Sequence, residues 1–234
     1  MFVAVVAVVL LAFAVVYYMA SNKDLKATQQ LKATPWADIG EAPTGVDIRL
    51  SGRLALLDDK GLTAPMSGRK CAAWRILIEE EYREGKRSGE ASTWKKVVDE
   101  SESVDFLLSD ETGRARVDGM HITLVADYDA KGGAELFRQL PENLEALLAK
   151  RGVQKSSWWS SQHNFRYRES ALEAGELVTV AGCGRWENDP NQKAGYRGTA
   201  KIFRLGPLVS GDLVASDDPS VVPDRKRPES TFSL

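Results

Sequence analysis

Hydrophobic and polar positions alternate in short runs along most of the chain, a pattern typical of strands with one buried face. The clearest unit is 104–117, in which an apolar run enters the turn-forming residues 109–113 and a short run at 115–117 leaves them. These turn formers end in Gly113, which can take a positive φ, and together they predict a tight β-hairpin. We place this hairpin at the centre of one mainly β domain over residues 46–215.

Similar strand patterns flank the hairpin at short spacing. They cover 46–57 with a bend at Gly52, 71–81 and 94–98 as a second hairpin, 121–125, 165–169 and 177–182 with a turn at Gly175, 201–205, and 213–215. Within the second hairpin, Trp74, Ile76 and Ile78 share one face. A helical spacing of leucines over 136–148 adds one amphipathic helix. The fold class is therefore mainly β (α+β), and the number of short strands predicts an OB-like or barrel-like domain.

The amino-terminal segment carries no charged side chain over residues 1–19. As a helix it would span about 28 Å, which matches a bilayer core of about 30 Å. A basic n-region is missing and Tyr18 stands where a cleavage site needs a small residue, so an uncleaved anchor is favoured over a signal peptide. We expect a transmembrane helix at 1–20, a lipid bilayer as partner through it, and a single-pass membrane protein.

Polar segments flank the predicted domain. Residues 21–45 read as a juxtamembrane linker with a short helix around 25–31, and residues 216–234, with three prolines among charged residues, read as a disordered tail. Lys23, Lys26 and Lys32 follow the hydrophobic segment, a bias that slightly favours the cytoplasmic side for the domain.

Composition narrows the function classes. The 31 basic and 33 acidic side chains give a net charge of −2, so no overall field attracts a polyanion, and nucleic acid is not expected as a partner. Cys71 and Cys183 lie far apart in apolar runs, which builds neither a disulfide framework nor a zinc site. We interpret them as buried thiols; a single bridge between them stays open if the domain lies in an oxidising compartment.

Candidate chemical groups have structural readings that explain them better. His121 and His163 lack a serine or cysteine partner in any recognised motif. Asp110 and Glu111 fit hydrogen bonding within the turn, and residues 182–184 fit a strand bend where backbones approach closely. Arg168 and Glu169 point to opposite faces of a strand, and one of them should pair inside the domain. No catalytic, cofactor-binding or metal-binding residue is assigned.

Two further features admit a functional and a structural reading. Loop 82–90 contains Arg83, Lys86 and Arg87, a possible basic contact patch, but its interspersed glutamates favour a loop kept soluble by charge. Trp158 and Trp159 are adjacent and cannot both face one side of a strand, so one could plug the core while the other lies exposed or at lipid headgroups.

Several stretches resemble the GIDE-type, or beside-a-membrane, domain of membrane-bound ubiquitin ligases in mitochondria and chloroplasts and of shorter prokaryotic relatives. The similar stretches, between about 52 and 182, are 62–71, Trp94 with Val97, 105–113, 167–172 with 175–176, and 180–182. The family ligases add a second membrane helix and a RING with two zinc ions, and this chain shows neither pattern. In the mitochondrial ligases the domain lies between two membranes, which leaves the side of the membrane open.

These observations lead to an expected function. We expect a membrane-anchored GIDE-like domain that works as a binding or assembly module near the bilayer, with a membrane or membrane-proximal protein as partner. One alternative is a component of an E3 ubiquitin ligase-type system whose RING another chain supplies. A second alternative is an unrecognised membrane-associated hydrolase.

Overall fold

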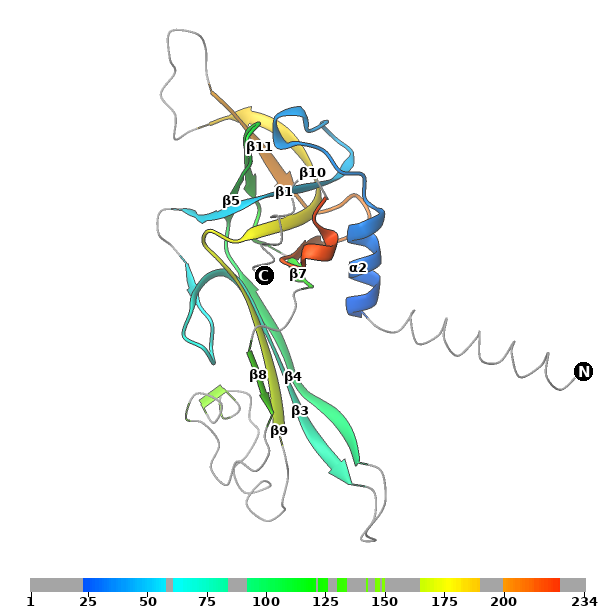
Figure 1. The fold of residues 1–234 in the computed structure, drawn as a ribbon, viewed down its shortest axis with the longest axis vertical. Coiled ribbons are helices and arrows are strands. Elements are labelled where there is room, and N and C mark those ends of the chain that lie inside the picture. The colour runs from blue at the N-terminus through cyan, green and yellow to red at the C-terminus, as the bar shows by residue number, and fades with distance from the viewer. Residues whose placement is uncertain are drawn as a thin grey trace, which may run out of the picture.

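The computed structural model describes residues 23–57, 61–83, 92–120, 122–125, 130–133, 165–189 and 200–223, with residues 142, 146, 147 and 149. Two sheets dominate this part of the chain, and one of them closes into a barrel while the other projects away from it (Figure 1).

Five strands form the barrel. They are β1 (Asp47–Leu56), β5 (Phe106–Ser109), β6 (Arg114–Val117), β10 (Leu177–Asn188) and β11 (Lys201–Gly206). Their order is β1-β5-β6-β11-β10, and pairing of β1 with β10 closes the ring. All neighbours are antiparallel except β6 and β11, which are parallel. This is a closed, five-stranded OB-type topology, so the barrel part of the sequence prediction is confirmed.

A bend in β1 lets one strand serve two neighbours. Residues 47–53 pair with β10, and residues 53–56 pair with β5. At the change of partner, a Cβ on Gly52 would lie 2.7 Å from the carbonyl oxygen of Ser109, so only glycine allows this approach. The change of partner takes place beside Gly52, where the sequence predicts a bulge or bend, and pairing of β1 with both β10 and β5 closes the barrel.

The barrel interior is filled by the inward-facing residues of its strands. The buried cluster includes Phe106, Leu108, Val180, Phe203 and Leu205, all with 0 % exposure. Two short strands, β12 (Leu213–Ser216) and β7 (Ile122–Leu124), extend the sheet beyond β10. Because inward residues alternate with outward ones, every second residue of β6, β10 and β11 is left for the outer surface.

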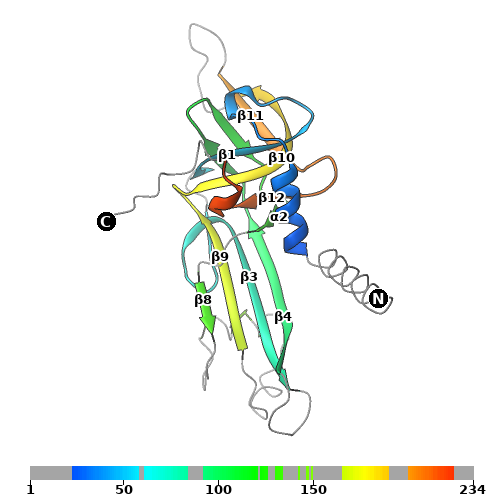
Figure 2. The same cartoon turned by 45° about the vertical axis from the view of Figure 1, so that its right-hand side comes forward.

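The second sheet, which we call the arm, projects from one end of the barrel (Figures 1 and 2). Its strands are β2 (Leu62–Thr63), β3 (Lys70–Arg83), β4 (Ser92–Ser103), β8 (Ala130–Gly133) and β9 (Phe165–Glu173). The predicted second hairpin is β3 with β4. Trp74, Ile76 and Ile78 do share a buried face, together with Val98 and Ala171. Gly175 has φ +92° in the turn that joins β9 to β10, as expected.

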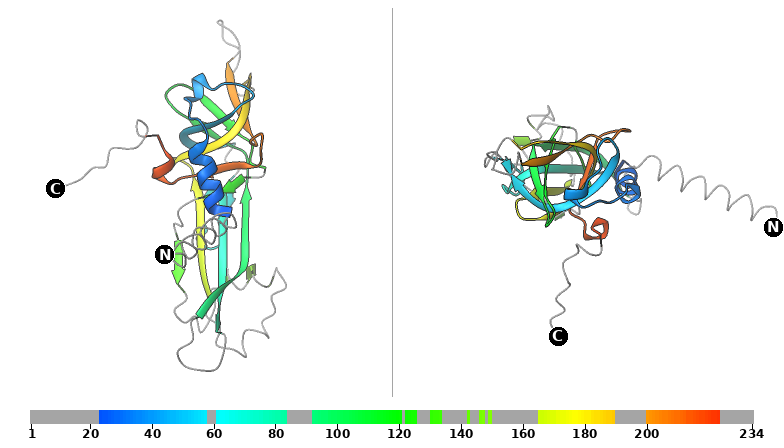
Figure 3. Two further views of the ribbon diagram at one scale, coloured as in Figure 1. Left: turned by 90° about the vertical axis from the view of Figure 1, so that its right-hand side faces the viewer. Right: turned by 90° about the horizontal axis from the view of Figure 1, so that it is seen from above.

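Both polar flanks contribute to the fold. Helix α2 (Lys23–Ala33) covers the predicted short helix and lies along the outside of the barrel (Figure 3), where its buried Ala27 and Leu31 pack against Ala181 and Val214. The short helices η1 (Ile39–Glu41) and η3 (Pro219–Val221) also pack on the domain through a buried apolar residue, Ile39 in η1 and Val221 in η3. Residues 23–45 are thus more than a linker, and residues 217–223 belong to the folded domain.

The expectation of a membrane span is corrected by the structure. Among the residues that the structure describes, no helix is both long and apolar enough to cross a bilayer. Helix α2 has 11 residues and is about 16 Å long, half the thickness of a hydrocarbon core. The helix expected at 1–20 lies outside the described residues. The single-pass assignment and the membrane localisation are therefore not supported by the structure, and the bilayer partner stays a prediction from the sequence.

Other expectations fall partly or wholly outside the described residues. Of the amphipathic helix predicted at 136–148, only residues 142, 146 and 147 are described; all are helical, and Leu147 packs on the buried face of the arm. Several other features lie outside the described residues. They are the side chains of loop 82–90, His121, Trp158, Trp159, His163 and the tail beyond 223.

Candidate functional site

Three arginines stand side by side on the outer face of the barrel. In the sheet register, Arg204 of β11 lies opposite Arg116 of β6 on one side and opposite Arg185 of β10 on the other. Their strand neighbours Val117 and Phe203 point inward and are fully buried, so the arginines point outward. We call Arg116, Arg204 and Arg185 the arginine row.

Carboxylates at the flanks hold the arginine row in place. Arg116 donates to Asp105 at 2.6 and 3.2 Å, and Arg185 donates to Glu187 at 2.8 Å. Arg204 donates to Asp118 at 3.0 Å and lies 4.0 Å from Glu187. Like charges on directly opposed residues repel, and these acids offset the repulsion. The row and its three carboxylates are together neutral.

Hydrogen bonding fixes the charge state of the row. Burial alone would raise the pKa of Asp105, but the backbone N–H of Gly119 at 2.8 Å and the bonds from Arg116 lower it below its ordinary value. The hydrogen bond and the negative charge of Asp118 raise the pKa of Arg204. Asp105 and Arg204 are therefore both charged at neutral pH.

The row is exposed and keeps donors for a ligand. The side chains of Arg116 and Arg204 are each 41 % exposed, and that of Arg185 is 69 % exposed. Hydrogen bonds within the described chain use Nε and Nη2 of Arg116, Nη2 of Arg204 and Nε of Arg185, and Nη1 of Arg204 lies 4.0 Å from Glu187. The other guanidinium N–H groups can donate to an incoming carboxylate, and the flanking acids already fix their orientation.

A fourth arginine, Arg114, lies beside the row, two residues before Arg116 on β6. Arg114 forms an ion pair with Asp189, whose side chain is only 2 % exposed. The backbone N–H of Asp189 donates to the carbonyl oxygen of Ala200 at 2.8 Å, which fixes the root of the β10–β11 connection. Arg114 is therefore a structural residue that stiffens the surface beside the row.

A cavity of about 730 Å³ lies beside the turn of the central hairpin. Its polar walls are occupied by hydrogen bonds within the chain: Arg53 donates to the carbonyl oxygen of Gly175 at 2.8 Å, and the hydroxyls of Ser51 and Thr179 are 2.8 Å apart. Arg53 thereby stabilises the turn between β9 and β10, and the contact between Ser51 and Thr179 joins β1 to β10.

Asp110, which the sequence assigned to the turn, organises it. Its Oδ1 accepts from the N–H groups of Thr112 and Gly113 at 2.8 and 2.9 Å, and its Oδ2 accepts from the N–H of Ile39 at 3.1 Å. The turn role of Asp110 is confirmed. Gly113 is not among the glycines of the described chain with positive φ, so the carboxylate and not a left-handed glycine closes this turn.

Both cysteines are free thiols in the structure. Cys71 is completely buried. Burial, together with the negative charges of Glu169 and Glu173, raises its pKa to about 11. It is protonated at neutral pH and is a poor nucleophile. Cys183 is half-buried between Gly182 and Gly184, where any Cβ on either glycine would collide with the neighbouring strand, as expected for a close backbone approach.

The buried carboxylate of Glu169 also has a structural role. Its two oxygens accept from the backbone N–H groups of Met66 and Ser67 at 2.7 and 3.0 Å. Glu169 thereby ties β9 to the turn before β3, and the prediction that one of Arg168 and Glu169 pairs inside the domain is confirmed. Within the described ranges, no group of three or more His, Cys, Asp or Glu residues is arranged to hold a metal ion.

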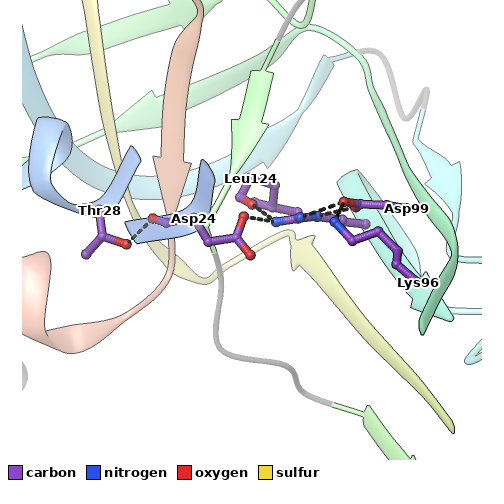
Figure 4. A network of polar contacts seen from close by, with 6 residues as sticks. Asp24, Thr28, Lys96, Asp99 and Leu124 are labelled. Atoms are coloured by element: carbon purple, nitrogen blue, oxygen red, sulfur yellow. Dashed lines mark hydrogen bonds and ion pairs between the residues drawn. The ribbon is translucent and has the colours of Figure 1, made fainter. Parts of the chain in front are cut away.

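A second polar network joins the arm to the barrel (Figure 4). Arg75 of β3 donates to Asp99 of β4 at 2.9 and 3.2 Å and to Asp24 of α2 at 2.6 Å. It also donates to the carbonyl oxygen of Leu124 in β7 at 3.3 Å. Burial would lower the pKa of Arg75, but the hydrogen bonds that it donates to Asp99 and Asp24, and their negative charges, outweigh burial and raise the pKa. This joint fixes the direction in which the arm leaves the barrel.

Local sequence patterns reveal only part of the arginine row. Arg114 and Arg116 alternate with Ala115 and Val117, so a shared outer face could have been read from the sequence alone. Their alignment with Arg204 depends on the parallel pairing of β6 with β11, which lie more than 80 residues apart in the chain.

No family model, no curated protein and no solved structure matches this chain. The similarity to the GIDE-type family therefore stays a prediction from the sequence, and the class that the structure itself defines is an OB-type barrel with a projecting sheet and an arginine row on its outer face.

Proposed function

We propose that this chain is a protein-binding module and that the arginine row receives the acidic face of a partner helix. The observation that carries the proposal is the register that aligns Arg116, Arg204 and Arg185 across three neighbouring strands. Because a fold of this type hosts many functions, the proposal rests on this surface and not on the topology.

Spacing favours a helix as the ligand. Neighbouring strands lie about 4.8 Å apart, and residues three or four apart on a helix have Cβ atoms about 5–6 Å apart. A helix laid across β6, β11 and β10 would bring glutamates at i, i+4 and i+8 close to successive arginines. Each charge-assisted hydrogen bond is worth about 1.5–3 kcal/mol, and the planar guanidinium suits a carboxylate.

The charge balance favours a protein over a nucleic acid. The carboxylates of Asp105, Asp118 and Glu187 lie within 2.6 to 4.0 Å of the row and neutralise it. A polyanion binds by continuous positive potential and release of counterions, which this surface lacks. Interleaved charges instead give selectivity for a partner whose own charges fall in the matching places.

The test uses two alanine-based helical peptides of identical composition, one with glutamates at i, i+4 and i+8 and one with the same glutamates spread around the helix. Fluorescence anisotropy with the full chain should show tighter binding of the first peptide. Arg204→Gln should weaken it by about 10-fold or more, and Lys201→Gln, on the same strand, should not. Equal binding of both peptides, or stronger binding of a single-stranded oligonucleotide, would contradict the proposal.

A further inference from the structure

The outer strand of the arm leaves one long edge of the sheet open. Within the described residues β4 pairs only with β3, and it forms the edge of the arm opposite β8 (Figure 2). Its 12 residues extend over about 40 Å. A long edge strand presents a row of backbone donors and acceptors, and proteins either block such an edge or pair it.

The charges along β4 are divided between its two halves. Lys95 and Lys96 lie in the first half, and Asp99 and Glu100 lie in the second. A bulge separates the halves: Ile78 of β3 pairs with Val98 whereas Glu79 pairs with Lys96, so Val97 is the extra residue. Charged residues on an edge can prevent random association, but this arrangement does more, because it is complementary to itself.

The bulge places each lysine on the same face as an acid. Lys95 pairs with Glu80 and Glu100 pairs with Ile76, two positions on one face of β3. Lys96 and Asp99 occupy the other face, where Lys96 Nζ lies 2.6 Å from Asp99 Oδ2. Without the bulge, Lys95 and Glu100 would lie on opposite faces of the sheet, and so would Lys96 and Asp99.

We propose that two copies of this chain associate by antiparallel pairing of their β4 strands about a two-fold axis between Val97 and Val98. In that register Lys95 faces Glu100 of the second copy and Lys96 faces Asp99 of the second copy, each contact occurring twice. Every pair joins opposite charges on one face of the joined sheet. Parallel pairing in register would instead oppose lysine to lysine and acid to acid.

This contact satisfies the rules of a closed dimer. A two-fold interface uses the same surface on both copies, so self-complementarity is required of it. The two arms would join into one continuous sheet. The arginine row lies on the barrel and takes no part in the contact, so this proposal stands or falls independently of the proposed helix-binding function.

The test measures self-association of the full chain by sedimentation velocity over a concentration series. The wild-type chain should dimerise, and Lys95→Glu or Glu100→Lys should each weaken the dimer by about 10-fold or more. A 1:1 mixture of the two variants should restore it, because each unlike pair then has opposite charges again. Charge reversals at exposed sites outside the arm, Lys201→Glu and Glu111→Lys, should have no effect.

Recovery in the mixture distinguishes strand pairing from damage to the fold, since a misfolded variant cannot be rescued by a second one. A wild-type chain that stays monomeric at its highest soluble concentration would overturn the proposal. So would single variants that dimerise normally, or a mixture of folded variants that stays monomeric.

Discussion

The barrel and the arm solve the problem of a sheet edge in different ways. In the barrel, pairing of β1 with β10 removes the edge, and the barrel strands supply more than half of a described cluster of 20 buried residues. Ala72, Ala73 and Leu172 of the arm belong to the same cluster. In the arm, one face covers a described cluster of seven buried residues, and β4 stays at the edge. Closure provides stability by apolar burial, whereas the arm adds the polar contacts of Arg75 to the apolar packing at its root and leaves an edge for pairing.

This difference predicts where stability is concentrated. The core of a closed barrel is a single packed unit, so damage to it should unfold the described domain as a whole. Arg75, Asp99 and Asp24 form the polar part of the joint between arm and barrel, so damage there should loosen the arm more than the barrel.

The largest effect is expected for Phe203→Ala in the barrel. Phe203 has 0 % exposure and packs edge-to-face on Trp186, with ring centroids 5.3 Å apart. Removing the ring should lower the free energy of unfolding by about 3–5 kcal/mol, measured by urea denaturation. Val209→Ala, at a site that is 76 % exposed, should change it by less than about 0.5 kcal/mol. Equal effects at the two sites would contradict a barrel-centred core.

An intermediate and localised effect is expected for Arg75→Ala. The side chain of Arg75 is 13 % exposed and that of Asp99 is 25 % exposed, so the variant leaves partly buried carboxylates without their main donor. We expect a loss of about 2 kcal/mol. Hydrogen exchange should become faster in β3 and β4 while β10 and β11 keep their protection.

Arg75→Lys is the matched control for this joint. It keeps the charge but cannot reach Asp99 through a two-pronged contact and Asp24 at the same time. It should therefore show a smaller loss of protection in the same strands. Faster exchange throughout the barrel in either variant would show that Arg75 supports the whole domain and that the arm is not a separate unit.

The same contrast explains what the sequence could predict. Strands and hairpins depend on local alternation and turn chemistry, so the central hairpin, the β3–β4 hairpin and the bend at Gly52 were accessible. Closure of β1 on β10 and the parallel pairing of β6 with β11 join distant segments, and no local pattern encodes them. The arginine row depends on that pairing and was missed for the same reason.

The polar segments on either side of the domain show a second limit to what local sequence patterns can predict. Residues 21–45 and 216–234 were assigned to a linker and a tail because charged residues and prolines dominate them. Single apolar residues such as Leu31, Ile39 and Val221 nevertheless dock on the barrel and are buried. One or two anchors per segment contribute little to an average over a window, although each buried side chain is worth about 1.5–3 kcal/mol.

The smallest change in the free energy of unfolding is expected at Cys71 in the arm. This change depends on pH and is specific to alkaline conditions. Its pKa is about 11 in the folded chain and about 8.5 when unfolded. A raised pKa means that the folded state holds the proton more tightly. Its contribution to stability is therefore fully present below about pH 8.5 and is lost as the pH rises toward 11, at up to about 1.4 kcal/mol per pH unit.

Urea denaturation of wild type and Cys71→Ala at pH 7 and pH 10 measures this contribution. Loss of the sulfur lowers the free energy of unfolding of the variant by the same amount at both pH values. The difference in this free energy between wild type and variant should therefore shrink by about 1–2 kcal/mol at pH 10. Cys183→Ala is the control at the half-buried thiol. If the difference in free energy of unfolding between wild type and Cys71→Ala is the same at pH 7 and pH 10, the thiol ionises as readily in the folded arm as in the unfolded chain.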